Sequence, residues 1–304
     1  MSPAEAGGEG PQLRKPDWLK VRIPSGERQR GVAGALGRHG LHTVCDEARC
    51  PNKAECWGQS TATFMVMGAT CTRGCRFCAV GTAREGEALR SEEPAELAAA
   101  IVELGIRYAV ITSVDRDDLP DRGSAHFAAC VRAIRDRDPG IRIETLAPDY
   151  QAGEIEALLE AGPEVFAHNI ETVERLQGVR DARASYRKSL ETLRLAAAFR
   201  KPGGGRLVVK SSLLLGLGER EDEVLAAMDA LRAVGVGSLV LGQYLRPTPL
   251  QVPVSEYVHP DSFARYAIEA RSRGFVSVVS APLARTSYLA KTSYDACAGA
   301  QDTP

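Results

Sequence analysis

The sequence lacks three features, and each absence excludes a class of protein. No apolar run in its 304 residues reaches the roughly 18 residues of a membrane-spanning helix. The N-terminal stretch has no apolar signal segment, and its Glu5 and Glu9 are unlike a transit peptide. The formal net charge is only −1, which argues against nucleic-acid binding. We therefore expect a cytoplasmic protein with no membrane or nucleic-acid partner, and a disordered tail over residues 1–12.

Cysteine, by contrast, is abundant and clustered. The chain has eight cysteines, and six of them fall between residues 45 and 78. In a long chain without a secretory signal, such clustering indicates metal or redox chemistry in a reducing compartment rather than disulfides. We interpret Cys130 as a small core residue and Cys297 as part of a frayed tail, and assign neither to a metal.

From residue 61 onwards, short β-rich apolar runs alternate with segments of helical periodicity. Repeated βα units favour a parallel sheet with helices outside it. Six units are too few for a complete barrel, so the expected fold class is α/β, a partial (β/α)6 TIM-type barrel with N- and C-terminal extensions. A doubly wound sheet is the alternative. The expected strands are 63–68, 108–113, 141–146, 164–170, 206–215 and 238–245, and the expected helices are 94–104, 124–136, 151–160, 185–199 and 219–233.

These expectations divide the chain into three parts. Residues 1–60 form an N-terminal extension with one cysteine motif, 61–250 form the barrel, and 251–304 form a C-terminal extension that includes a last apolar run at 275–280. "KPGGG" (201–205) is interpreted as a loop, and "LGLGE" (215–219) as a close turn near the cofactor site.

The stretch "CTRGCRFC" (71–78) places three cysteines in eight residues. On a helix they would share a face but be strung over about 10 Å, at about 1.5 Å per residue, which is too long to converge on one centre. The segment must therefore be a loop, which Gly74 assists. It directly follows the first expected strand, and βα barrels place their chemistry at the C-terminal ends of the strands.

Three thiolates suit a [4Fe–4S] cluster with one iron left open to another ligand. A structural zinc site, which prefers four ligands, is the alternative. The C-x3-C-x2-C spacing of Cys71, Cys75 and Cys78 resembles the signature of the radical S-adenosylmethionine (SAM) superfamily. The resemblance implies that the open iron binds SAM, that one electron cleaves SAM to a 5′-deoxyadenosyl radical, and that Phe77 lies near the adenine.

A second motif, "CDEARCPNKAEC", spaces Cys45, Cys50 and Cys56 as C-x4-C-x5-C, again with zinc as the alternative. The combination of the two motifs resembles the lipoyl synthase family. The resemblance extends over roughly residues 14–290 and is carried by "TSVDRDDLPDRGSAHF" (112–127), "ETLAPD" (144–149), "HNIETVERL" (168–176), "VRDARASYRKSL" (179–190), "LLLGLGE" (213–219), "GQYLRPT" (242–248) and "PLARTSY" (282–288).

This resemblance implies two [4Fe–4S] clusters. The catalytic set would be Cys71, Cys75, Cys78 and Ser287, with the first three holding the radical-forming cluster. An auxiliary cluster would be held by the second cysteine motif and by Ser287, the second hydroxyl residue of "RTSY" (285–288). A serine oxygen is a hard ligand among soft thiolates, so its bond to iron should be the easiest to break.

The resemblance also implies the reaction. The substrate would be an octanoyl chain on a lysine of a lipoyl-carrier domain, and two SAM molecules would be consumed to insert sulfur from the auxiliary cluster at C6 and C8. Expected partners are the glycine cleavage H protein, the acyltransferase subunits of 2-oxoacid dehydrogenases, a ferredoxin- or flavodoxin-type reductant and an iron–sulfur carrier protein.

Three further residues are candidate SAM contacts. Asn169 and Glu171 alternate along an expected strand end and so point the same way. Lys210 lies in a strongly apolar strand, where a charge is costly unless paired. The alternative for the first two is a strand-end turn with satisfied polar groups, and Lys210 is a candidate contact for either the SAM carboxylate or the substrate. His168 and Arg183 are weaker candidates for the SAM pocket and for substrate contact.

The sequence departs from the family pattern at three places: Thr286 stands for a serine, Ala281 for a glycine and Gln251 for a histidine. These changes remove no expected ligand but bear on substrate choice. Two other functions compete: a paralogue that thiolates another acyl or peptide substrate, and an electron-transfer or iron–sulfur storage protein. The storage protein would need neither a barrel nor an open iron.

Overall fold

The computed structural model describes residues 13–20, 27–47, 50, 52–58, 62–201 and 207–299. The expected disordered tail (1–12) and all but Lys201 of the expected loop at 201–205 lie outside the described residues. Among the described helices, none combines the length and apolarity that a bilayer crossing requires.

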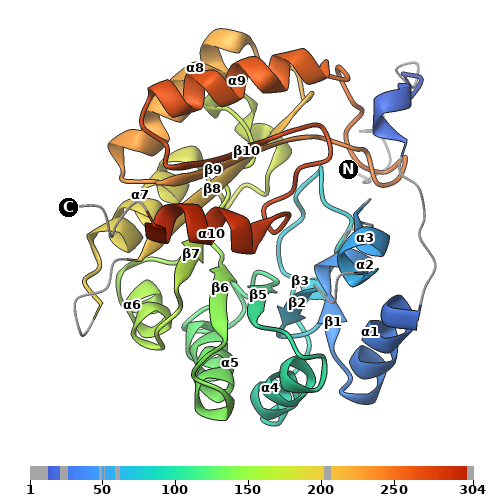
Figure 1. The fold of residues 1–304 in the computed structure, drawn as a ribbon, viewed down its shortest axis with the longest axis vertical. Coiled ribbons are helices and arrows are strands. Elements are labelled where there is room, and N and C mark those ends of the chain that lie inside the picture. The colour runs from blue at the N-terminus through green and yellow to red at the C-terminus, as the bar shows by residue number, and fades with distance from the viewer. Residues whose placement is uncertain are drawn as a thin grey trace.

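An eight-stranded sheet forms the centre of the molecule (Figure 1). Its order is β1-β2-β5-β6-β7-β8-β9-β10, with β1 antiparallel to β2 and every other pair parallel. The order follows the sequence without a reversal, which excludes the doubly wound alternative. The strands are β1 (His42–Thr43), β2 (Thr63–Val66), β5 (Tyr108–Ser113), β6 (Arg142–Leu146), β7 (Val165–Ala167), β8 (Val208–Leu215), β9 (Ser238–Gln243) and β10 (Ser277–Ser280).

Helices connect successive parallel strands, and neighbouring helices such as α4, α5 and α6 pack against each other. They are α4 (Glu93–Glu103), α5 (Ser124–Arg137), α6 (Ala152–Glu160), α7 (Tyr186–Ala198), α8 (Glu221–Ala233) and α9 (Pro260–Ser272). Their starts follow from the sequence: Pro260 opens α9 with a preset backbone angle, and the Ser185 hydroxyl accepts the Lys188 amide at the start of α7.

The open α/β architecture is confirmed, and all five expected helices are found within two residues of their expected bounds. The sheet has one more parallel strand than expected, because the apolar run at 275–280 pairs with β9 instead of standing apart from the sheet. Within the described residues the edge strands β1 and β10 do not pair, so the barrel stays open. The division at residues 60 and 250 stays a prediction.

The structure also contains elements, in the extensions and within residues 61–250, that the periodicity did not predict. They include the 3-10 helices η1 (Asp17–Leu19) and η2 (Glu174–Val179), the small β3 (Thr70–Cys71) and β4 (Gly81–Thr82) pair, and the helices α1 (Glu27–Arg38), α2 (Val44–Glu47), α3 (Lys53–Gly58) and α10 (Ala290–Gly299). In Figure 1, α2 and α3 lie beside the β1–β2 edge of the sheet.

The C-terminal helix α10 covers the strands β8 and β10 (Figure 1). Its Tyr294 and Cys297 pack against Val165 and Val208 of neighbouring strands. Cys297 is buried, so our interpretation of this segment as a frayed tail is wrong for the described residues up to 299. The interpretation of Cys130 as a core residue is confirmed, since it is fully buried on α5.

Candidate cofactor site

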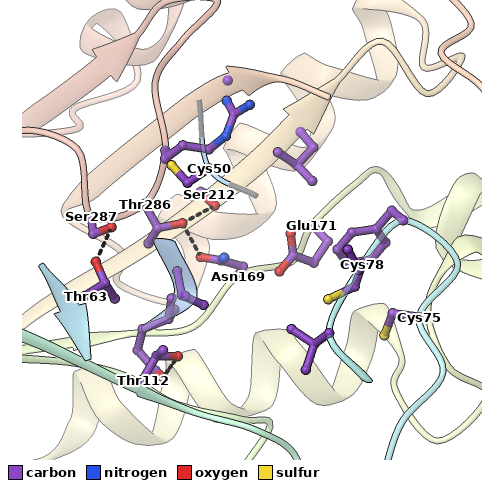
Figure 2. A pocket seen from close by; sticks show the side chains of 18 of the residues that line it. Cys50, Thr63, Cys75, Cys78, Thr112, Asn169, Glu171, Ser212, Thr286 and Ser287 are labelled. Atoms are coloured by element: carbon purple, nitrogen blue, oxygen red, sulfur yellow. Dashed lines mark hydrogen bonds between the residues drawn. The ribbon is translucent and has the colours of Figure 1, made fainter. Parts of the chain in front are cut away.

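A cavity of about 870 Å³ contains the expected chemistry. All six clustered cysteines line it, together with strand-end residues and the "RTSY" segment. Figure 2 shows Cys50 beside the C-terminal segment and Cys75 and Cys78 on the other side, with Asn169 and Glu171 between them. The fold therefore brings two thiol triads from different segments of the chain to the same cavity.

The first triad lies on an irregular loop, as expected. Cys71 ends β3, and the amide of Cys78 donates to the carbonyl of Cys75 at 3.0 Å. Neighbouring segments hold the loop from outside: the Arg76 amide donates to Val179, and the Gly74 amide to the Asp181 carboxylate at 2.8 Å. These anchors hold the loop against the C-terminal end of η2 and the residues that follow it.

A buried arginine adds the strongest anchor of this loop. The guanidinium of Arg73 pairs with Asp117 at 2.8 Å, with Asp149 at 2.8 Å and with Asp115 at 3.2 Å. Arg73 is only 4% exposed, so these charge-assisted contacts are shielded from water. Three acidic residues from two strand ends thus tie the cysteine loop to the sheet.

The thiols of this loop fit a soft, positively charged metal centre. Burial, together with neighbouring carboxylates and thiols, raises the pKa of Cys71 to about 11 and that of Cys75 to about 12. Burial likewise raises the pKa of Cys78 to about 11, with Cys71 adding to the effect. Thiolates form here only when a cation compensates them, which is the behaviour expected of metal ligands.

The second triad comes from short helices and the link between them. Cys45 lies on α2, Cys56 lies on α3, and the amide of Cys50 donates to the carbonyl of Cys45 at 3.1 Å. Burial and then the other two thiols raise the pKa of Cys56 to about 12. The three sulfur atoms therefore influence one another, and they form a donor set of the same kind as the first triad.

The C-terminal segment closes this second site. The side chain of Asn52 donates to the Leu283 carbonyl at 2.7 Å, and the Tyr288 hydroxyl donates to Glu55 at 3.3 Å. Ser287 lies between these two contacts along the chain, and its Oγ accepts a hydrogen bond from Thr63 Oγ1 at 2.8 Å (Figure 2). Ser287 and the second triad thus line the same cavity, and the role of Ser287 as a metal ligand stays a prediction.

Thr286 faces the other way, towards the SAM candidates. Its hydroxyl donates to Asn169 Oδ1 at 3.2 Å and shares a hydrogen bond of 2.9 Å with Ser212 (Figure 2). The two neighbours Thr286 and Ser287 therefore contact different residues of the cavity wall, Asn169 and Ser212 in one case and Thr63 in the other.

Asn169, Glu171, Phe77 and His168 line the cavity, and their contact with SAM stays a prediction. The first two are not on a strand, because β7 ends at Ala167; Glu171 instead has a positive φ of 65° and bridges to Leu213. His168 is held by Ala147 and Ser189, and burial lowers its pKa to about 4, so it stays neutral.

Two of our expectations need correction. Lys210 does not line the cavity; its ammonium pairs with the Glu144 carboxylate at 2.8 Å, both groups are 1% exposed, and Tyr108 donates to the same carboxylate at 2.7 Å. The charge is paired within the protein, so Lys210 is no longer a SAM candidate. The "LGLGE" segment does form a turn, with both glycines at positive φ, but it lies outside the cavity lining.

Arg183, a weaker candidate, and Gln251, a departure from the family pattern, both contact the protein near the first cysteine loop. Arg183 pairs with Asp181 at 2.8 Å and with Asp117 at 3.4 Å, which places it behind the first cysteine loop. Gln251 donates to the Cys78 carbonyl at 3.0 Å, so this departure from the family pattern touches the same loop. Both residues support the loop and are absent from the cavity lining.

Comparison with known proteins identifies the family. The sequence profile of the Radical SAM superfamily matches residues 65–231, and that of the N-terminal domain of lipoyl synthase matches residues 5–50. Lipoyl synthase of Marinobacter nauticus is 50% identical over 291 residues, covering 94% of this chain and 82% of the relative. Lipoyl synthase of Anaeromyxobacter dehalogenans is 52% identical over 280 residues, covering 91% and 94%. The chain belongs to the lipoyl synthase family.

Solved structures support the fold alone. Methylornithine synthase has a TM-score of 0.55 at 13% identity, covering 85% of this chain and 82% of that one. SuiB of Streptococcus suis, solved with S-adenosylmethionine bound, has a TM-score of 0.55 at 10% identity, covering 83% and 54%. Membership of the family makes this chain a radical SAM sulfur-insertion enzyme, with SAM, one radical-forming [4Fe–4S] cluster and one auxiliary cluster.

Sequence reasoning missed some residues of the site, above all Thr63 and Ser212. Both are polar residues in buried strands, "TFMV" and "VVKSSLLL", and both hydrogen-bond to the C-terminal segment. A polar side chain in a strand that is otherwise buried was the available signal, because such a group needs a partner. The partner itself could not be identified from the sequence.

Proposed function

We propose that this enzyme inserts two sulfur atoms at C6 and C8 of an octanoyl chain that is amide-linked to a lysine of a carrier protein, giving the lipoyl group. The observation that carries the proposal is the shared cavity, in which two thiol triads and the Ser287 hydroxyl face one space. An enzyme that joins radical formation to sulfur transfer needs both centres within reach of one substrate chain. An electron-transfer or storage protein does not need a shared cavity.

We assign the cluster ligands residue by residue. Cys71, Cys75 and Cys78 would hold the radical-forming cluster, and Cys45, Cys50, Cys56 and Ser287 the auxiliary one. When bound, these groups with SAM supply a carbon radical that abstracts hydrogen from unactivated carbons, and sulfide for the new C–S bonds.

Residues of the chain itself would hold the first cysteine loop, orient SAM and exclude water. Arg73 and its carboxylate partners fix the first cysteine loop, and Phe77, Asn169 and Glu171 line the wall on which we place SAM. Asn169 is oriented by Thr286, so the C-terminal segment reaches the SAM wall and the second triad at once. A rigid wall of this kind keeps water from a reactive radical.

The partners that we propose follow from this chemistry. The substrate is carried by a lipoyl-carrier protein, for which the glycine cleavage H protein and the acyltransferase subunits of 2-oxoacid dehydrogenases are our candidates. A ferredoxin- or flavodoxin-type protein would supply electrons, and an iron–sulfur carrier would rebuild the auxiliary cluster. We place the enzyme in the cytoplasm, because thiol triads need a reducing compartment.

Anaerobic turnover tests the proposal. The reconstituted enzyme, SAM and a chemical reductant are mixed with an octanoyl-lysyl carrier peptide, and the product is analysed by mass spectrometry. We expect a product with two added sulfur atoms and two 5′-deoxyadenosine molecules for each one. A zinc-containing protein without iron–sulfur absorbance would contradict the proposal, and sulfur insertion only into a different acyl or peptide substrate would indicate a paralogue.

A further inference from the structure

Thr63 contacts both ends of the second site. It is the first residue of β2 and is only 3% exposed. Its hydroxyl donates to Ser287 Oγ at 2.8 Å. Burial raises the pKa of the Cys45 thiol, and the nearby backbone amide of Thr63 acts against this rise. One buried residue therefore contacts a proposed ligand from the N-terminal extension and another from the C-terminal extension.

The direction of the hydroxyl contact matters for a metal ligand. A threonine hydroxyl has one proton to donate, and here it points at Ser287 Oγ. A serine oxygen bound to iron carries negative charge, and a hydrogen bond to a charged oxygen is stronger than one between neutral groups. Thr63 is buried, so its hydroxyl is held in place by the protein, and removing it leaves Ser287 Oγ without this donor.

We propose that Thr63 is a positioning residue for the auxiliary cluster: its hydroxyl holds Ser287 Oγ towards the cysteine triad and stabilises that oxygen when it binds iron. This inference rests on the proposed assignment of Ser287 as the fourth ligand. Its consequence is that the weakest bond of the sulfur-donating cluster is controlled by β2, the strand that also leads into the first cysteine loop.

The substitution Thr63→Val isolates the hydroxyl. Valine has nearly the same shape and keeps the backbone amide that contacts Cys45, so the three thiolates should assemble a cluster as before. Thr63→Ser restores the hydroxyl. Thr145→Val is the matched control, because Thr145 is equally buried in a strand and its hydroxyl donates to the Val165 carbonyl at 3.3 Å, away from the cavity.

The measurement uses the full chain with Cys71, Cys75 and Cys78 all changed to Ala, so that only the auxiliary cluster is present. Mössbauer spectra report the ligand environment of each iron, and a chelator reports the rate of iron release. We expect Thr63→Val to bind near-normal iron, to shift the spectrum of one iron as Ser287→Ala does, and to release iron about tenfold faster. Thr63→Ser and Thr145→Val should behave as the parent.

The outcomes separate this inference from the proposed function. If Ser287→Ala leaves the spectrum unchanged, Ser287 is not a ligand and the ligand assignment itself fails. If Ser287→Ala changes the spectrum but Thr63→Val does not, only the role of Thr63 is overturned. Equal acceleration of iron release by Thr63→Val and Thr145→Val would also overturn it, since a general loss of packing would then explain both.

Discussion

The two thiol triads are built in different ways. The first lies on a single loop of eight residues, which is anchored to the barrel by its own Arg73 and by the carboxylate of Asp181. The second comes from the N-terminal extension, with Cys45 and Cys56 on short helices, and its proposed oxygen ligand Ser287 comes from the other end of the chain. A site on one loop of the barrel can form when the barrel folds. A site between the two extensions forms only when both extensions pack correctly against the barrel.

This difference suits the two roles. A radical-forming cluster acts repeatedly and benefits from a rigid frame, which the buried Arg73 contacts provide. A cluster that gives up sulfur must be opened and rebuilt. A site whose fourth ligand is an oxygen on a separate segment can lose that ligand without dismantling the barrel.

The largest expected effect is a complete separation of SAM cleavage from sulfur insertion when one cysteine triad is removed. With Cys45, Cys50 and Cys56 changed to Ala, SAM cleavage to 5′-deoxyadenosine should persist while no sulfur enters the substrate. With Cys71, Cys75 and Cys78 changed to Ala, both activities should vanish and about half of the iron should remain, since each triad is expected to hold four irons. Iron analysis and product chromatography measure this, and lipoyl product from the first variant would refute the donor role.

Gly242 tests whether the second site depends on docking. A Cβ at this position of β9 would lie 2.1 Å from the Ala284 carbonyl oxygen, so Gly242→Ala must displace the segment that carries Ser287. A shift of about 1 Å can cost about 100-fold in rate, and we expect a loss of that order in sulfur insertion with SAM cleavage retained. Gly237→Ala, which meets nothing within 4 Å, is the control. If Gly242→Ala reduced SAM cleavage and sulfur insertion equally, the position of the C-terminal segment would not affect the second site selectively.

The cysteine loop, Lys210 and Thr63 show how much of the fold and of the site could be predicted from the sequence. The cysteine spacings and the βα alternation are local patterns, so the loop at 71–78, the helices and the open parallel sheet could be predicted. Lys210 could not be placed, because an apolar strand shows that a charge needs a partner but not whether Glu144 or a cofactor provides it. Thr63 was missed for the same reason: its partner is 224 positions away.

Lys210 gives the next test, because it belongs to neither triad. Lys210→Met leaves the Glu144 carboxylate buried without its cation, which should lower the free energy of unfolding by about 3–5 kcal/mol. The affinity for SAM should not change. Urea denaturation and SAM titration measure the two effects, and Lys291→Met, which breaks an exposed ion pair with Asp295, should cost less than about 1 kcal/mol. A marked loss of SAM affinity with unchanged stability would return Lys210 to the cofactor site.

The smallest expected effect concerns Thr286, which connects the two sites. Its hydroxyl hydrogen-bonds to Asn169 and Ser212, so Thr286→Val should leave both side chains without this partner and loosen the SAM wall. The loss of about one net hydrogen bond predicts a SAM dissociation constant about 5- to 10-fold higher, with the iron content unchanged. Thr286→Ser keeps the hydroxyl, and should therefore be nearly silent. If Thr286→Val instead bound SAM normally but lost auxiliary iron, the ligand of the second site would lie at position 286, and the C-terminal segment would serve one triad rather than linking two.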